Sequence, residues 1–156
     1  MPTLKCEVEI QAPPRAIFHL LTNYRLNPWF NHGIGWKIEK VTITTDKKQG
    51  KGVQTSWVKI EEGKSSYWEE EITDWIENEY VSYKSVTGPS KSGSHTLKPT
   101  DKGTKLTSTR TLPDDFSNNQ IKMSKEHLLT LQENVKVVLE HQMKLIKDRD
   151  KITKIP

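Results

Sequence analysis

Three polar side chains that could do chemistry, Glu70, His95 and Arg110, lie in segments that otherwise alternate like β-strands. Glu70 and His95 are candidates for general base and general acid on an enolisable carbonyl compound, the proton transfers that an aldol-type cyclisation needs. Arg110 can hold a carboxylate, a phosphate or a phenolate, through two parallel hydrogen bonds where the geometry permits. A structural interpretation stays open for each: Glu70 with Arg110 as a buried ion pair, and His95 as a satisfied strand residue.

Strand alternation predicts that these polar residues share one face of a sheet with three aromatic residues. Successive side chains of a strand point to opposite faces, so counting in twos finds residues on one face. Counting from Leu97 reaches His95, and counting from Leu106 reaches Arg110. A bulge in any strand would reverse the assignment. The inward-facing set predicted in this way is Trp57, Trp68, Glu70, Tyr83, His95 and Arg110.

This set has the composition of a small-molecule site, because flat apolar walls surround a few polar groups. The aromatic residues alone would serve equally well as plain core. The chain has five histidines, but no pair has the close helical spacing of a zinc-binding motif, so we predict no metal site. We expect no other cofactor.

Residues 118–148 have the pattern of one long amphipathic helix, with apolar side chains at steps of three and four. Ser117 and Gln120 match the Ser-x-x-Gln capping box that begins such a helix. The apolar face must lie on the sheet. We therefore predict that Leu128, Leu131 and Val135 close the binding site from the helix side.

The rest of the chain predicts six consecutive antiparallel strands behind a strand and two short helices. Residues 4–10 alternate as a strand, and Pro14 suits the first turn of a helix, where its missing N–H costs nothing. Residues 24–29 make a second short helical turn. The six strands, separated by turn residues at hairpin spacing, are predicted at residues 35–45, 52–60, 65–75, 80–87, 93–99 and 104–112.

Several short motifs occur in the order known from one superfamily. The segment APPRAIFHLLTN at residues 12–23, followed by Trp29, is similar to the opening of the START-like superfamily, also called SRPBCC or Bet v 1-like. It most resembles the polyketide cyclase/dehydrase branch. GKG at 50–52, EITDW at 71–75 and LKPTDKGTKLT at 97–107 resemble later landmarks. The resemblance implies an α+β helix-grip fold: a seven-stranded curved antiparallel sheet, two short N-terminal helices and one long C-terminal helix enclosing a cavity.

The resemblance suggests three functions of different classes. Members of this superfamily include cyclases, lipid and sterol carriers, quinone-binding proteins, hormone receptors and chaperone co-activators, with no shared catalytic motif to transfer. Our first hypothesis is binding or transport of a hydrophobic small molecule, such as a lipid, a quinone or an aromatic polyketide-like compound. The second is a small cyclase or dehydratase that uses Glu70, His95 or Tyr83. The third is a protein-interaction module with a closed cavity, in which a surface such as the basic residues 47–51 is functional.

Composition narrows the remaining possibilities. At 156 residues, with 33% hydrophobic and 28% charged side chains, we expect one START-like domain at residues 1–150 with a lean core and a loose tail at 151–156. The single cysteine, Cys6, excludes an internal disulfide. Lysines are interleaved with acids, so the formal charge of +4 predicts no nucleic-acid surface. Met1 leads directly into strand residues, and we expect a cytoplasmic monomer or weak homodimer without stable membrane insertion.

Overall fold

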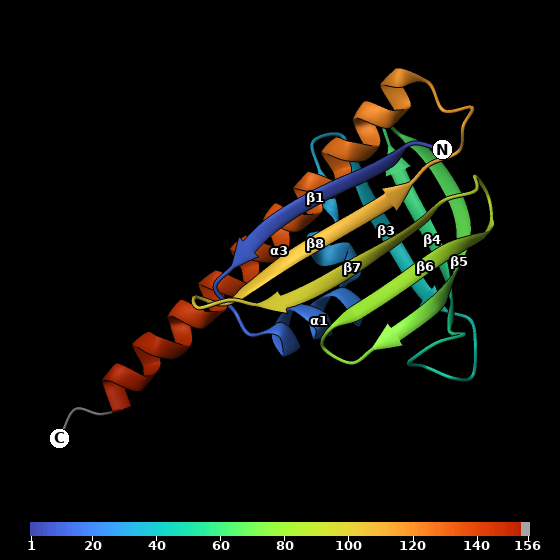
Figure 1. Ribbon diagram of the computed structural model, residues 1–156. Helices are drawn as coiled ribbons and strands as arrows, with labels where there is room; N and C mark the ends of the chain where they lie inside the picture. Colours follow the sequence, from blue (N-terminus) through green and yellow to red (C-terminus); the bar gives the residue numbers. More distant parts are fainter. Residues whose placement is uncertain (154–156) are drawn as a thin grey trace.

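The computed structural model describes the backbone of residues 1–153 and the side chains of residues 1–149. One antiparallel sheet holds all the described strands, in the order β1-β8-β7-β6-β5-β4-β3-β2. The strands are β1 (Thr3–Ile10), β2 (His32–Gly33), β3 (Trp36–Ile43), β4 (Gln54–Glu61), β5 (Lys64–Ile76), β6 (Tyr80–Thr87), β7 (Ser92–Pro99) and β8 (Thr104–Thr111). The helices are α1 (Pro14–Thr22), α2 (Asn27–Phe30) and α3 (Asn118–Thr153). Figure 1 shows the sheet curving around one side of α3, with β1 and β8 alongside the helix.

The predicted curved antiparallel sheet with two short helices and one long helix is confirmed, but the predicted number of strands is wrong. The sheet has eight strands rather than seven, because β2 pairs with the start of β3. Two residues are too few to show the alternation that reveals a strand in a sequence. Gly33 has its place in β2 for a steric reason: a Cβ atom there would collide with the indole of Trp36.

The capping box predicted for the long helix is confirmed. The backbone N–H of Gln120 donates to Ser117 Oγ at 3.1 Å, and the backbone N–H of Ser117 donates to Gln120 Oε1 at 2.8 Å. The helix continues to Thr153, five residues beyond the predicted end at Asp148, and its last turns project past the sheet (Figure 1). The first three residues of the predicted tail are therefore helical, and positions 154–156 lie outside the described residues.

One β-bulge changes which side chains of β5 face inward. The register between β5 and β6 shifts between Ile72 and Asp74, so the extra residue is Thr73. Counting in twos from Ile72 would send Trp75 outward, but the bulge turns it inward. Trp75 packs edge-on against Phe18 of α1, with 5.0 Å between the ring centroids. The part of β5 that precedes Ile72 keeps the predicted phase.

The helices add few features beyond core packing. Pro14 is the first residue of α1, as predicted, and Ile17, Phe18, Leu20 and Leu21 of this helix are buried. Within the described residues, no helix combines the length and the apolar composition needed to cross a membrane.

Candidate functional site

The space between the sheet and α3 contains a cavity of about 120 Å³. All six inward-facing residues predicted from strand alternation line it: Trp57, Trp68, Glu70, Tyr83, His95 and Arg110. Leu131 lines it from α3. The other two predicted helix residues, Leu128 and Val135, are completely buried in the hydrophobic core and are not among the lining residues. Their contact with a ligand, like that of the lining residues, stays a prediction.

Two stacked indoles form the flat wall of the cavity. Trp57 and Trp68 are direct cross-strand partners on β4 and β5, with ring centroids 5.8 Å apart and an interplanar angle of 11°. The ring of Tyr24 stands edge-on to Trp57 at 6.2 Å. Trp57 Nε1 donates to Thr55 Oγ1 at 2.8 Å, so its polar atom is satisfied and the ring is held in place. The wall is therefore a preformed apolar surface.

Glu70 is held by its own strand rather than by Arg110. Trp68 Nε1 donates to Glu70 Oε2 at 2.7 Å. Burial raises the pKa of the Glu70 carboxyl above its usual value, although the bond from Trp68 and the charges of Arg110 and Lys91 oppose the shift. The ion pairs found among the described residues do not join Glu70 to Arg110. The buried ion pair considered from the sequence is therefore not formed.

Arg110 is reached across the sheet by Tyr83 because Gly93 lies between them. Tyr83 pairs with Gly93, and Gly93 pairs with Arg110, so the three residues form one row across β6, β7 and β8. A Cβ atom at Gly93 would collide with the Tyr83 hydroxyl. Burial works to lower the pKa of the Arg110 guanidinium, but Tyr83 and Glu70 outweigh it and raise the pKa. Arg110 also donates to Ser124 Oγ on α3 at 3.3 Å.

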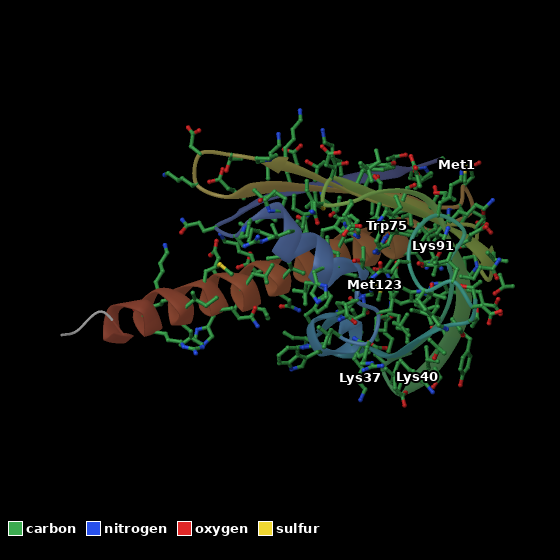
Figure 2. All side chains as sticks on the ribbon, turned by 90° about the horizontal axis from the view of Figure 1, so that it is seen from below. Met1, Lys37, Lys40, Trp75, Lys91 and Met123 are labelled. Atoms are coloured by element: carbon green, nitrogen blue, oxygen red, sulfur yellow. The ribbon has the colours of Figure 1, made fainter. Side chains whose placement is uncertain are left out.

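The sequence reasoning missed two further cations at the cavity. Lys59 lines it, and counting by twos once more along β4 from Trp57 would have found this residue. Lys91 lies in the loop between β6 and β7, where no periodic signal exists, and its ammonium group lies 5.0 Å from the centroid of the Trp68 ring. Figure 2 shows Lys91 at the end of the molecule opposite the C-terminal turns of α3. Burial, reinforced by Arg110, lowers the pKa of Lys91 to about 8.

The sequence reasoning also passed over His127, which lines the cavity one helical turn before Leu131. Its ring lies against Trp36 at a tilt of 32°, with 4.2 Å between the ring centroids. Lys59 Nζ lies 3.1 Å from His127 Nδ1, and His127 Nε2 lies 3.3 Å from Glu61 Oε2. Burial, followed by the charge of Lys59, lowers the pKa of His127 to about 4. The lysine therefore donates to a neutral imidazole at neutral pH.

The electrostatic balance of the cavity is positive. Arg110, Lys59 and Lys91 line it as cations, while Glu70 is its one carboxyl group among the described lining residues. His95 adds no charge at neutral pH, because burial and then Arg110 lower its pKa to about 4. Lys59 is already paired with Glu61 at 3.3 Å, so an anion entering the cavity would gain most from Arg110 and Lys91. The described residues contain no group of three or more His, Cys, Asp or Glu side chains placed to hold a metal ion.

Solved structures with the same arrangement of elements cover most of this chain. Ara h 8.0201 superposes with a TM-score of 0.72 at 17% sequence identity, over 90% of this chain and 98% of its own. Ginseng major latex-like protein 151 from Panax ginseng gives a TM-score of 0.72 at 15% identity, over 88% of this chain and 97% of its own. The chain has the START-like, or Bet v 1-like, fold.

Bacterial proteins share this START-like fold. A protein from Thermus thermophilus superposes with a TM-score of 0.71 at 20% identity, over 90% of this chain and 99% of its own. At these identities the likeness concerns the fold. No protein-family model matches the sequence, and a search of curated proteins finds no match.

Proposed function

We propose that this START-like protein binds a small hydrophobic molecule that carries an anionic group, in the cavity between the sheet and α3. The observation that carries the proposal is the combination of a stacked Trp57–Trp68 wall with three lining cations and one lining carboxyl group. Apolar walls favour the transfer of an aromatic or aliphatic body out of water. The surplus of cations favours a negative charge at the polar end of the ligand.

The size of the cavity favours a compact ligand. An engineered apolar cavity of about 150 Å³ is large enough to hold benzene. A cavity of about 120 Å³ therefore suits a single aromatic ring or a short aliphatic chain with one carboxylate. A lipid tail, a quinone with a side chain or a multi-ring polyketide would require the lining side chains to move. We infer that an aromatic carboxylate is the best first probe.

A titration against related probes tests this proposal. Tryptophan fluorescence and calorimetry would be followed during addition of benzoate, its neutral analogue benzamide, the cation benzylamine, octanoate and a benzoquinone. We expect benzoate to bind more tightly than benzamide and benzylamine, because only benzoate uses the positive charge of the cavity. Equal affinity for benzoate and benzamide, or no binding by any probe, would contradict the proposal.

Arg110→Met is the decisive variant for the anionic part. It removes the guanidinium while keeping a long apolar side chain, and we expect benzoate affinity to fall by about tenfold or more. Arg15→Met is the matched control, since Arg15 is exposed on α1 and does not line the cavity. Unchanged benzoate affinity in Arg110→Met would show that the anion does not bind at this arginine.

One observation favours the enzymatic alternative. Burial raises the pKa of the Glu70 carboxyl, the direction that makes a carboxylate a stronger base near neutral pH. Glu70→Gln separates the two functions. Under the binding proposal this change removes the one lining carboxyl and strengthens benzoate binding; under the enzymatic alternative it abolishes turnover of a carbonyl substrate.

The third hypothesis, a protein-interaction module, required an interior closed by side chains, and the cavity does not favour it.

A further inference from the structure

His95, one of the polar residues that line the cavity, is linked by hydrogen bonds through Ser108 to Gln132, a buried glutamine on α3. We infer that Gln132 and Ser108 hold His95 in the tautomer that carries its proton on Nε2, so that the cavity presents a neutral N–H donor and selects ligands with an acceptor oxygen. The assignment of the tautomer stands alone. The selection of ligands rests on the proposed function and narrows it to anions whose charge lies on an acceptor oxygen, such as carboxylates and phenolates.

Gln132 sets the direction of the hydrogen bonds. Its side chain is only 2% exposed, and its Nε2 atom lies 2.9 Å from the carbonyl oxygen of Cys6 and 2.9 Å from Ser108 Oγ. A carbonyl oxygen can only accept, so the amide group must turn its nitrogen toward Cys6. Both hydrogens of that nitrogen are then used, one for each partner. Ser108 Oγ is therefore an acceptor from Gln132.

The hydrogen bond from Gln132 also determines how Ser108 bonds to His95. The two residues are cross-strand partners on β8 and β7, and Ser108 Oγ lies 2.7 Å from His95 Nδ1. Ser108 is completely buried, so its hydroxyl hydrogen needs an acceptor within the protein. His95 Nδ1 is the acceptor found within reach among the described residues. The imidazole proton must then be on Nε2.

The other protonation states fit the same contacts less well. A proton on Nδ1 could still be accepted by the second lone pair of Ser108 Oγ, but the buried serine hydrogen would then have no acceptor. The doubly protonated cation has this same fault. It is also opposed by burial and by the neighbouring Arg110, which lower the pKa of His95 to about 4.

The tautomer determines what His95 offers a ligand. Nδ1 is occupied by Ser108, and Nε2 has no hydrogen-bond partner in the part of the chain that the structure describes. His95 lines the cavity, so its N–H is available there together with the guanidinium of Arg110. A group with acceptor oxygens can bind both. The Nε2 atom that His95 presents to the cavity has no free lone pair at neutral pH, so this residue is a hydrogen-bond donor there and cannot act as a general base.

Nuclear magnetic resonance of the full chain, without ligand, tests the tautomer. Long-range ¹H–¹⁵N correlation of the histidine side chains at pH 7 shows which ring nitrogen carries the proton. The spectrum of His95→Gln assigns the signals of His95. We expect a protonated Nε2 and an unprotonated Nδ1. A protonated Nδ1, or two protonated nitrogens, would overturn the inference.

Two variants test whether Ser108 and Gln132 cause this preference. In Ser108→Ala, and separately in Gln132→Met, we expect the His95 signals to move toward a mixture of tautomers. Ser94→Ala is the matched control, because its hydroxyl pairs with Thr109 Oγ1 at 2.7 Å on the opposite face of the same strands. An unchanged tautomer in whichever of the two variants folds would show that the pair does not hold His95.

Benzoate binding tests the selection of ligands. We expect Ser108→Ala to weaken benzoate binding by about fivefold. In a mixture of tautomers, some of the molecules carry no proton on Nε2, and these offer the carboxylate no donor at this position. If benzoate binds the unmodified protein and Ser108→Ala binds it equally well, the selection by His95 is wrong while the proposed function stands. If the Nε2–H tautomer is found and no acceptor ligand binds, the proposed function fails and the tautomer assignment stands.

Discussion

The space between the sheet and α3 has two halves that are built from the same strands. In one half the inward-facing side chains are apolar and close-packed, as at Val53, Ile72, Val81, Leu97 and Leu106, each at most 4% exposed. Two or four residues away from these positions, in one chain direction or the other, the inward-facing side chains become aromatic, polar or charged. These positions line the cavity: Trp57, Trp68, Glu70, Tyr83, His95 and Arg110.

The difference between the halves shows a division of labour within one sheet. The apolar half gains stability from burial, at about 25 cal/mol for each Å² removed from water. The cavity half holds Arg110 without a carboxylate contact and keeps His95 and His127 neutral at neutral pH. Burying these polar groups lowers the stability of the fold, but it leaves them free to interact with a ligand. Changes in the apolar half should therefore affect folding, and changes in the cavity half should affect binding.

The largest expected effect comes from truncating the apolar half. Leu106 is completely buried, and Leu106→Ala should lower the free energy of unfolding by about 3 kcal/mol, because the cavity it leaves cannot be refilled. Urea denaturation measures this. Arg110→Met in the other half should change the free energy of unfolding by less than about 1 kcal/mol, since it removes a buried charge that lacks an ionic partner. Equal losses in both variants would end the distinction between the halves.

Acid should destabilise the protein through the cavity half. The pKa of His95 is about 4 in the folded protein against 6.5 for the free side chain, so between these values the unfolded chain binds more protons. Stability from this residue is complete above pH 6.5 and is lost as the pH falls toward 4, by about 2 kcal/mol between pH 7 and pH 5. Urea denaturation across this range should show a smaller loss in His95→Gln. Identical pH dependence in the two proteins would contradict the assignment.

A methyl group at Gly93 should disturb the row that joins Tyr83 to Arg110. The added Cβ would collide with the Tyr83 hydroxyl and lie 2.6 Å from the Thr109 carbonyl oxygen. We expect Gly93→Ala to lower the free energy of unfolding by about 2 kcal/mol and to weaken benzoate binding. Ser94→Ala, one residue away on the outer face, should change stability by less than about 0.5 kcal/mol. A stable Gly93→Ala with full benzoate affinity would show that the row is not needed.

The smallest expected effect is a pH dependence of binding. The pKa of Lys91 is about 8, so this residue loses its charge as the pH rises through that value. Benzoate affinity measured by calorimetry should fall by about fivefold between pH 7 and pH 9, corresponding to about 1 kcal/mol. Lys91→Met should remove most of this dependence, whereas Lys98→Met on the outer face should retain it. A fall of the same size in Lys91→Met would assign the effect to another group.

Strand alternation was a reliable guide to the cavity where the strands are regular. The inward phases of β4, β6, β7 and β8 follow from their apolar residues, and the part of β5 before Ile72 keeps its phase as well. The same method would have failed at Trp75, because the bulge at Thr73 reverses the faces. Bulges depend on the pairing of two strands, and the periodicity of one strand contains no record of them.

Three titratable lining residues that the sequence did not reveal, Lys59, His127 and Lys91, lie on a strand, a helix and a loop. Lys59 lies two residues beyond Trp57 on β4, so the same count carried one step further would have found it. His127 shares a helix face with Leu131, but the phase of a helix does not indicate which part of its apolar stripe lies over a cavity. Lys91 lies in a loop, where backbone direction is set by the fold and not by periodicity.

Local patterns in this chain were sufficient for the order of its elements, the capped start of α3, the fold and part of the cavity wall, because periodicity, caps and turn residues act over a few neighbouring positions. They did not reveal β2, the bulge at Thr73, the separation of Glu70 from Arg110, or the approach of Gln132 to Ser108 and His95. β2 is too short to alternate, whereas the separation of Glu70 from Arg110 and the approach of Gln132 to Ser108 involve residues far apart in the chain, as Cys6 and Gln132 are. Such contacts depend on how whole strands and helices pack, which no short stretch of sequence specifies.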